Sequence, residues 1–197
     1  MLTILHRRNT LAELAATDLN FGVEVDIHAF GSKLTVHHDA LAEGEDFERW
    51  LDAYNHSFAI FNVKEEGVEQ VVVDLAAKRG IVDFFLLDMS FPALIKTTRK
   101  NESRIAVRMS EYEPIEGALR MAGKVEWVWL DIFESFSLTT DDNRRLHEAG
   151  MKICIVSPEL HGRSGREVEA IRNRIATYDL KLDAVCTKQP QMWNSPL

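Results

Sequence analysis

A short stretch near the N-terminus concentrates side chains that could do acid–base or metal chemistry. In residues 23–28 (Val-Glu-Val-Asp-Ile-His), two acids and a histidine alternate with β-branched residues. Because side chains alternate across a strand, Glu24, Asp26 and His28 should share one face of a strand. Residues 34–39 form a second β-type run that ends in two histidines and an aspartate, after a predicted turn. We therefore predict a hairpin that carries more ionisable side chains than a purely structural hairpin needs.

The residue types in this hairpin indicate phosphoryl chemistry. Glu24 and Asp26 supply oxygen atoms, which Mg²⁺ and Ca²⁺ prefer as ligands. His6, at the end of the first predicted strand, and His38, at the end of the hairpin, could flank a bound phosphoryl group. The pKa of a free histidine is about 6.5, so one imidazole could take a proton from the attacking oxygen while the other protonates the leaving oxygen.

Two basic residues complete this candidate site. Arg7 and Lys64 would offset the phosphate charge, Arg7 through a bidentate fork and Lys64 as a point charge. Each candidate also has a plainer interpretation: His6 could be a hydrogen-bonding strand end, and Glu24 and Asp26 could be surface acids on an edge strand. Because Arg7 follows His6 and both join the hairpin, and because acids buried between apolar positions need a partner such as a metal, we favour the functional interpretation.

The elements that must position these residues follow a regular pattern of strands and helices. The predicted strands cover residues 2–5, 23–28, 58–64, 82–88, 104–109, 125–130, 151–156 and 182–186. The predicted helices cover residues 11–17, 46–54, 65–78, 114–121, 141–149 and 164–178, with a short one after Pro92. Alternation of strand and helix implies right-handed crossovers and a parallel sheet, and eight repeats favour a closed barrel.

We therefore predict an α/β fold, a compact (β/α)8 TIM barrel with a short hairpin after the second strand, in a single domain over residues 1–197. The chain is short for a fold that usually needs about 250 residues, so several helices must be brief. A doubly wound open sheet is the alternative, but no glycine-rich phosphate loop follows the first strand.

Barrel enzymes place their chemistry at the C-terminal ends of the strands. The ends predicted here carry His6, Arg7, Glu24, Asp26, His28, Asn62, Lys64, Asp88, Arg108, Asp131 and Lys188. Asp88 or Asp131 alone would be interpreted as a loop cap, but the set favours a functional rim. His161, in the loop after the seventh strand, could line the same mouth. Trp193 could close the bottom of the barrel or line the site, and the sequence leaves both open.

Composition and charge exclude some functions and limit others. With 46% apolar residues, the chain can form one sizeable core. The net charge of -8 argues against broad binding of nucleic acid or anionic membranes, because phosphates would be repelled. The sequence contains no apolar run of about 18 residues, so it predicts no membrane span. The N-terminal apolar stretch is too short for a secretory signal. We expect a cytoplasmic location.

The motifs resemble those of the glycerophosphodiester phosphodiesterases, a family in the phospholipase C-like phosphodiesterase superfamily. That pattern is His-Arg after the first strand, then Glu-x-Asp, then a hydrophobic run that ends in His-Asp. It appears here as His6-Arg7, Glu24-Val25-Asp26 and His38-Asp39, and residues 187–190 (Thr-Lys-Gln-Pro) resemble the family's closing Thr-Asp-x-Pro. The resemblance implies a TIM barrel that hydrolyses a small glycerophosphodiester-type substrate with Mg²⁺ or Ca²⁺.

The resemblance also assigns roles, with one departure. It implies that Glu24 and Asp26 hold the metal and that His6 and His38 are the acid–base pair. The family's third-strand Glu-x-Lys appears here as Asn-Val-Lys, so the lysine is kept and the third carboxylate ligand becomes the amide of Asn62. The carbonyl oxygen of an asparagine can still bind a hard cation, but the site loses a negative charge and its metal affinity should fall.

Three hypotheses follow for the function. The first is a metal-dependent phosphodiester hydrolase that uses the two histidines. The second is a catalytically weakened barrel that binds a phosphosugar or a phospholipid headgroup, because of the change at Asn62. The third, a sugar-phosphate isomerase or lyase, ranks last because the predicted loops after the seventh and eighth strands lack a glycine signature. The sequence does not indicate the alcohol groups of the substrate or the oligomeric state.

Overall fold

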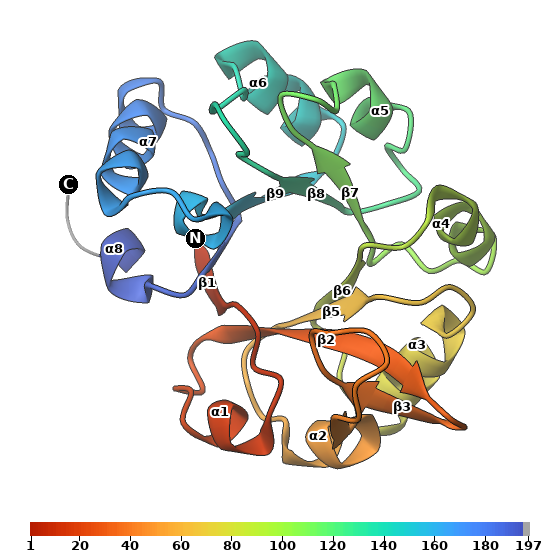
Figure 1. Cartoon of the computed structure of the whole chain (residues 1–197). Helices are drawn as coiled ribbons and strands as arrows, with labels where there is room; N and C mark the ends of the chain where they lie inside the picture. Colours follow the sequence, from red (N-terminus) through yellow and green to blue (C-terminus); the bar gives the residue numbers. More distant parts are fainter. Residues whose placement is uncertain (195–197) are drawn as a thin grey trace. The chain divides into compact units, whose positions relative to one another are not determined.

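In the computed structural model, which describes residues 1–194, β-strands alternate with α-helices along the chain (Figure 1). Contacts divide the chain into two compact units. The N-terminal unit runs from Ile4 to Ile105, and the C-terminal unit joins Met1–Thr3 to the chain from Ala106 onward. Strand β1 (Leu2–Leu5) therefore contributes residues to both units.

The N-terminal unit is built on parallel strands in the order β1, β2, β5 and β6. Its strands are β2 (Gly22–Phe30), β3 (Lys33–Val36), β4 (Glu45–Asp46), β5 (Ala59–Val63) and β6 (Phe84–Leu87). Its helices are α1 (Leu11–Ala15), α2 (Phe47–Ala53), α3 (Glu69–Lys78) and α4 (Phe91–Thr98). In Figure 1, α2 and α3 lie on one side of β2 and β5.

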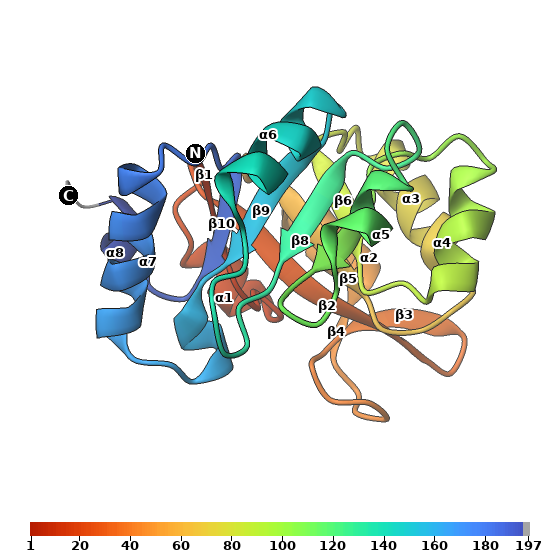
Figure 2. The ribbon, with the colours of Figure 1, turned by 90° about the horizontal axis from the view of Figure 1, so that it is seen from above.

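Strand β2 is the longest strand and the centre of this unit. Residues 23–28 of β2 are all buried, so both its apolar and its polar face are covered. Its inner part pairs in parallel with β1 and β5, and its outer part pairs antiparallel with β3, where Ile27 lies opposite Val36 (Figure 2). The aromatic residues of α2 complete this packing, because Phe47 and Trp50 are fully buried and Phe47 makes an edge contact with Phe61 of β5.

The C-terminal unit repeats the parallel arrangement, with β10 beside β1 and then β9, β8 and β7 in order. Its strands are β7 (Ala106–Met109), β8 (Trp127–Leu130), β9 (Lys152–Val156) and β10 (Ala184–Thr187). Its helices are α5 (Ile115–Leu119), α6 (Thr140–Glu148), the 3₁₀ helix η1 (Pro158–His161), α7 (Gly165–Thr177) and α8 (Pro190–Asn194). Capping boxes begin α6 at Thr139 and α7 at Ser164.

The prediction of an α/β fold with parallel strands is confirmed, and several predicted boundaries are wrong. The helix expected from residue 65 begins at Glu69, because Gly67 adopts a left-handed φ of 100° that ends regular structure there. Helix α8, which begins at Pro190, was not predicted. Among the residues that the structure describes, no helix is both long and apolar enough to span a membrane.

Two glycines provide a test of how closely the strands pack. A Cβ on Gly22, at the start of β2, would lie 2.9 Å from Cγ1 of Ile4 and 3.1 Å from the carbonyl oxygen of Phe58. We expect Gly22→Ala to lower the free energy of unfolding by about 1–3 kcal/mol through overpacking. A Cβ on Gly117, inside α5, would meet no atom within 4 Å, so Gly117→Ala should raise that free energy by about 0.5–1 kcal/mol. Urea denaturation measures both, and equal effects would contradict this packing.

Candidate functional site

Two buried carboxylates on β2 form the centre of the site. Glu24 and Asp26 are 0% and 1% exposed, and they point to the same face of the strand because they are two residues apart. On the neighbouring strand β5, Asn62 lies in register with Asp26. Its side-chain amide donates one hydrogen bond to Oε1 of Glu24 (3.0 Å) and one to Oδ1 of Asp26 (3.1 Å). A single amide group therefore bridges the two acids.

The two carboxylates differ in their electrostatics although they are neighbours. Burial, and next the charge of Asp26, raises the pKa of Glu24 from its ordinary value of 4.5 to about 7. Burial also acts to raise the pKa of Asp26, but hydrogen bonds from Asn9 and Lys64 and the charges of Lys64 and His38 outweigh it and lower that pKa. At neutral pH, Asp26 carries the negative charge of the pair throughout, and Glu24 is poised to gain or lose a proton.

Each carboxylate has one imidazole beside it. Nε2 of His6 lies 3.7 Å from Oε2 of Glu24, and Nδ1 of His38 lies 3.2 Å from Oδ2 of Asp26. Because the Asp26 carboxylate accepts, Nδ1 of His38 carries the proton of this hydrogen bond. The third histidine on this side, His28, contacts Oε1 of Glu65 (3.3 Å) and the backbone carbonyl of His38 (3.4 Å). His28 therefore supports the loop that carries His38.

The predicted cations also reach the acids. Nζ of Lys64 lies 3.2 Å from Oδ1 of Asp26 and 3.1 Å from Oδ2 of Asp88. Nε of Arg7 lies 3.7 Å from Oδ2 of Asp26, and the backbone N–H of Arg7 donates to Oε2 of Glu24 at 2.7 Å. Arg7 and Asp88 both have positive φ values, 54° and 62°, at the ends of their strands. Such strained backbone in non-glycine residues tends to cluster at functional sites.

One residue of this cluster was missed by the sequence analysis. Asn9 donates from its amide to Oδ2 of Asp26 (2.9 Å) and accepts from the backbone N–H of Asp26 (3.0 Å). Asn9 is not the cap of α1, because Thr10 caps that helix in a capping box with Glu13. The full box at Thr10 was the signal, because it leaves the preceding asparagine side chain available for another partner.

All of the predicted site residues of the N-terminal unit therefore come together. Contacts link them in a chain from His6 to Glu24, through Asn62 to Asp26, and on to His38, Arg7 and Lys64. Within residues 1–194, no group of three or more His, Cys, Asp or Glu side chains is arranged to hold a metal ion.

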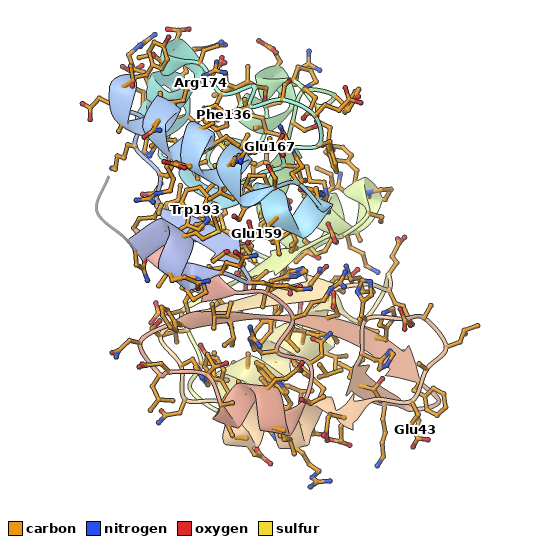
Figure 3. The ribbon with its side chains drawn as sticks, turned by 60° about the vertical axis from the view of Figure 1, so that its left-hand side comes forward. Glu43, Phe136, Glu159, Glu167, Arg174 and Trp193 are labelled. Atoms are coloured by element: carbon orange, nitrogen blue, oxygen red, sulfur yellow. The ribbon has the colours of Figure 1, made fainter. Side chains whose placement is uncertain are left out.

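The C-terminal unit has its own polar group at the ends of β9 and β10. Glu159 accepts hydrogen bonds from the hydroxyls of Ser157 and Thr187 and from the backbone N–H of Lys188 (3.1 Å). The indole of Trp193 donates to the Ser157 hydroxyl at 2.7 Å (Figure 3). Trp193 therefore packs at the C-terminal ends of β9 and β10, and not at the opposite ends of these strands. The Thr-Lys-Gln-Pro segment serves here to hold α8.

Comparison with known proteins identifies the fold. No protein-family model and no curated protein matches the sequence. Among solved structures, a glycerophosphodiester phosphodiesterase from Agrobacterium tumefaciens is similar with a TM-score of 0.67 and 15% identity, covering 99% of this chain and 100% of that one. A glycerophosphoryl diester phosphodiesterase from Parabacteroides distasonis gives 0.66 and 13%, covering 97% and 84%. The chain therefore has the fold of the glycerophosphodiester phosphodiesterases.

The raised pKa of Glu24 predicts a pH-dependent stability without bound cations. Folded Glu24 binds its proton more tightly than unfolded Glu24, so this stabilisation is complete below pH 4.5 and is lost as the pH rises through about 7. The loss should total about 3 kcal/mol. Urea denaturation in EDTA between pH 5 and 8 should show this decline in the wild type and a flatter profile in Glu24→Gln. The same decline in both proteins would show that Glu24 is not its source.

Proposed function

We propose that this protein is a cation-assisted phosphodiester hydrolase that acts on a small glycerophosphodiester-type substrate. The observation that carries the proposal is the pairing of each buried carboxylate with one imidazole, His6 at Glu24 and His38 at Asp26. The fold shared with two phosphodiesterases along nearly the whole chain supports the same class. We also propose that the whole chain forms one closed (β/α)8 barrel and a single domain.

The donor set fits a hard divalent cation such as Mg²⁺ or Ca²⁺. Glu24 and Asp26 are oxygen donors, and burying two acids side by side is costly unless positive charge compensates them. The carbonyl oxygen of Asn62 is buried without a hydrogen-bond partner. Turning this amide over would direct its oxygen to the position where its nitrogen now bridges the acids. These three side chains would then hold the cation, which would polarise a phosphoryl oxygen.

His38 and His6 would each carry out one of the two proton transfers of the reaction. With Nδ1 of His38 donating to Asp26, its Nε2 is an acceptor that can take a proton from the attacking water. As the bond from water to phosphorus forms, the bond from phosphorus to the alcohol breaks, and His6 gives a proton to the departing alcohol oxygen. Arg7 and Lys64 offset the charge of the phosphate. The products are an alcohol and a phosphomonoester.

A second candidate function rests on Asn62. Its amide makes two hydrogen bonds with the carboxylates, and a cation must displace both of them. A site that keeps this arrangement would bind a phosphosugar or a lipid headgroup without cleaving it. The two functions predict different results when an acid replaces Asn62. If the natural protein only binds its ligand, phosphodiester turnover should appear with the third acid. If the natural protein is already a hydrolase, its turnover should only increase.

The roles of the histidines can be tested by turnover. We expect His6→Ala and His38→Ala each to lower turnover of bis(4-nitrophenyl) phosphate with Mg²⁺ or Ca²⁺ by roughly 10²- to 10⁴-fold, the usual contribution of a general acid or base. The control is His37→Ala, since His37 is the neighbour of His38 but hydrogen-bonds to the backbone of Asp39 instead. Unchanged turnover in both test variants would reject these roles.

The role of Asn62 can be tested by metal binding. Asn62→Asp adds a third charge, so calorimetry should show Mn²⁺ or Ca²⁺ binding about tenfold or more tightly, since one added charge is worth on the order of 1–4 kcal/mol at this range. Without cations the variant should unfold more easily, by about 2 kcal/mol, because two hydrogen bonds become a repulsion. Asn173→Asp, an exposed change of equal charge on α7, is the control. Phosphodiester turnover that appears only in Asn62→Asp would identify the natural protein as a binder.

A further inference from the structure

Residues from β7, the end of β8 and η1 form a second ionisable group in the C-terminal unit, which shares no residue with the proposed hydrolytic site. Asp131, at the end of β8, is buried and binds two basic side chains. One is Arg108 of β7, whose guanidinium forms an ion pair with Oδ2 of Asp131. The other is His161 of η1, whose Nε2 lies 3.2 Å from Oδ1 of Asp131. The carboxylate thus fixes both side chains at the ends of neighbouring strands.

Exposed aromatic side chains lie directly beside this group. The ring centroid of Phe133 is 4.8 Å from that of His161, and Tyr112 is 6.3 Å from Phe133. Phe133 is 40% and Tyr112 65% exposed, so solvent reaches a large apolar surface here. The hydrogen bond that Tyr112 donates to Glu134 raises the pKa of Tyr112. Such an exposed aromatic surface next to fixed polar groups is typical of a binding site.

The two acids near this surface are occupied by local partners. The carboxylate of Glu111 accepts backbone N–H groups of Phe133 (3.4 Å), Glu134 and Ser135 (2.9 Å). That of Glu134 accepts from Tyr112. Both acids are therefore engaged in holding the loop after β8. The side chains presented beside the aromatic surface are Arg108 and His161, which are 36% and 24% exposed while Asp131 is 2% exposed.

We propose that Arg108, His161 and the adjoining Phe133 form a binding site for a small organic oxyanion that carries an aromatic or other apolar body. Arg108 would bind the oxyanion with its guanidinium fork. Nε2 of His161 faces the Asp131 carboxylate and carries a proton. With a second proton on Nδ1, as in an imidazolium, the Nδ1–H would donate to an oxygen of the ligand. Phe133 and Tyr112 would pack against the apolar body.

The interpretation without a ligand is that Arg108 and His161 only compensate the buried charge of Asp131. One close ion pair with Arg108 already provides a hydrogen-bonded partner for that charge. The C-terminal unit offers a comparison, because His147 forms the same type of pair with Asp183 at 3.1 Å, and no arginine or exposed aromatic side chain is recorded in contact with His147 among the described residues. The site is thus distinguished by the combination of arginine, histidine and aromatic surface.

Phenyl phosphate is a suitable probe for the full-length protein, with inorganic phosphate and benzyl alcohol as its separate halves. Calorimetry in EDTA should show phenyl phosphate binding more tightly than either half. Arg108→Gln and His161→Gln should each weaken it by roughly 10- to 100-fold, the loss expected for a charge-assisted hydrogen bond. Phe133→Ala should weaken phenyl phosphate and leave inorganic phosphate unchanged, and the control His147→Gln should leave both unchanged.

The outcomes separate this site from the proposed hydrolytic site. Binding equal to wild type in both Arg108→Gln and His161→Gln overturns the proposal, as does a loss confined to Lys64→Gln. If Arg108→Gln fails to fold, Arg108→Lys keeps the charge without the fork and should still weaken binding about tenfold. Unchanged phosphodiester turnover in His38→Ala would reject the hydrolytic roles but would not affect this result, because the proposal requires only residues of the C-terminal unit.

Discussion

The site in the N-terminal unit depends on one constraint, the burial of two carboxylates side by side on a single strand. Neither acid is exposed to water, so every charge and lone pair must be balanced by the protein or by a ligand. The balance is made by Asn62, which bridges both acids, by the backbone of Arg7 at Glu24, and by Asn9 and Lys64 at Asp26. As a result, the two acids bind protons with different strength: the pKa of Glu24 is raised and that of Asp26 is lowered.

The topology makes this constraint possible. Strand β2 lies between β1 and β5, and because all three are parallel, their C-terminal ends fall on the same side of the unit. The register of β5 against β2 places Asn62 opposite Asp26, and residues 6 and 7 directly follow β1. The left-handed backbone of Arg7 turns its N–H to Glu24. The strain at Arg7 is thus offset by a hydrogen bond to a buried acid.

Sequence patterns predicted the strands and the shared face of Glu24 and Asp26, because alternation along a strand is a local property. They did not predict how Asn62 is used. The residue type indicated an oxygen ligand, whereas in the fold its nitrogen faces the acids, a choice that depends on the charge of groups 36 and 38 residues away in sequence. Asn9 was missed for a similar reason, since its partner Asp26 is distant in sequence. The late start of α3 depends on Gly67, whose φ the helical periodicity cannot reveal.

Two buried aspartates, Asp26 in the middle of β2 and Asp131 just after β8, have similar neighbours but are proposed to serve ligands of opposite charge. Each binds an imidazole and a basic side chain, His38 and Lys64 in one case and His161 and Arg108 in the other. Asp26 is also joined through an amide to Glu24, so a second carboxylate lies at that centre, as our proposal of a cation there requires. At Asp131 two basic side chains contact one buried carboxylate, as our proposal of an anion at that surface requires. Under these two proposals, the number of acids at the centre, more than the type of the surrounding bases, determines the sign of the charge that each group accepts.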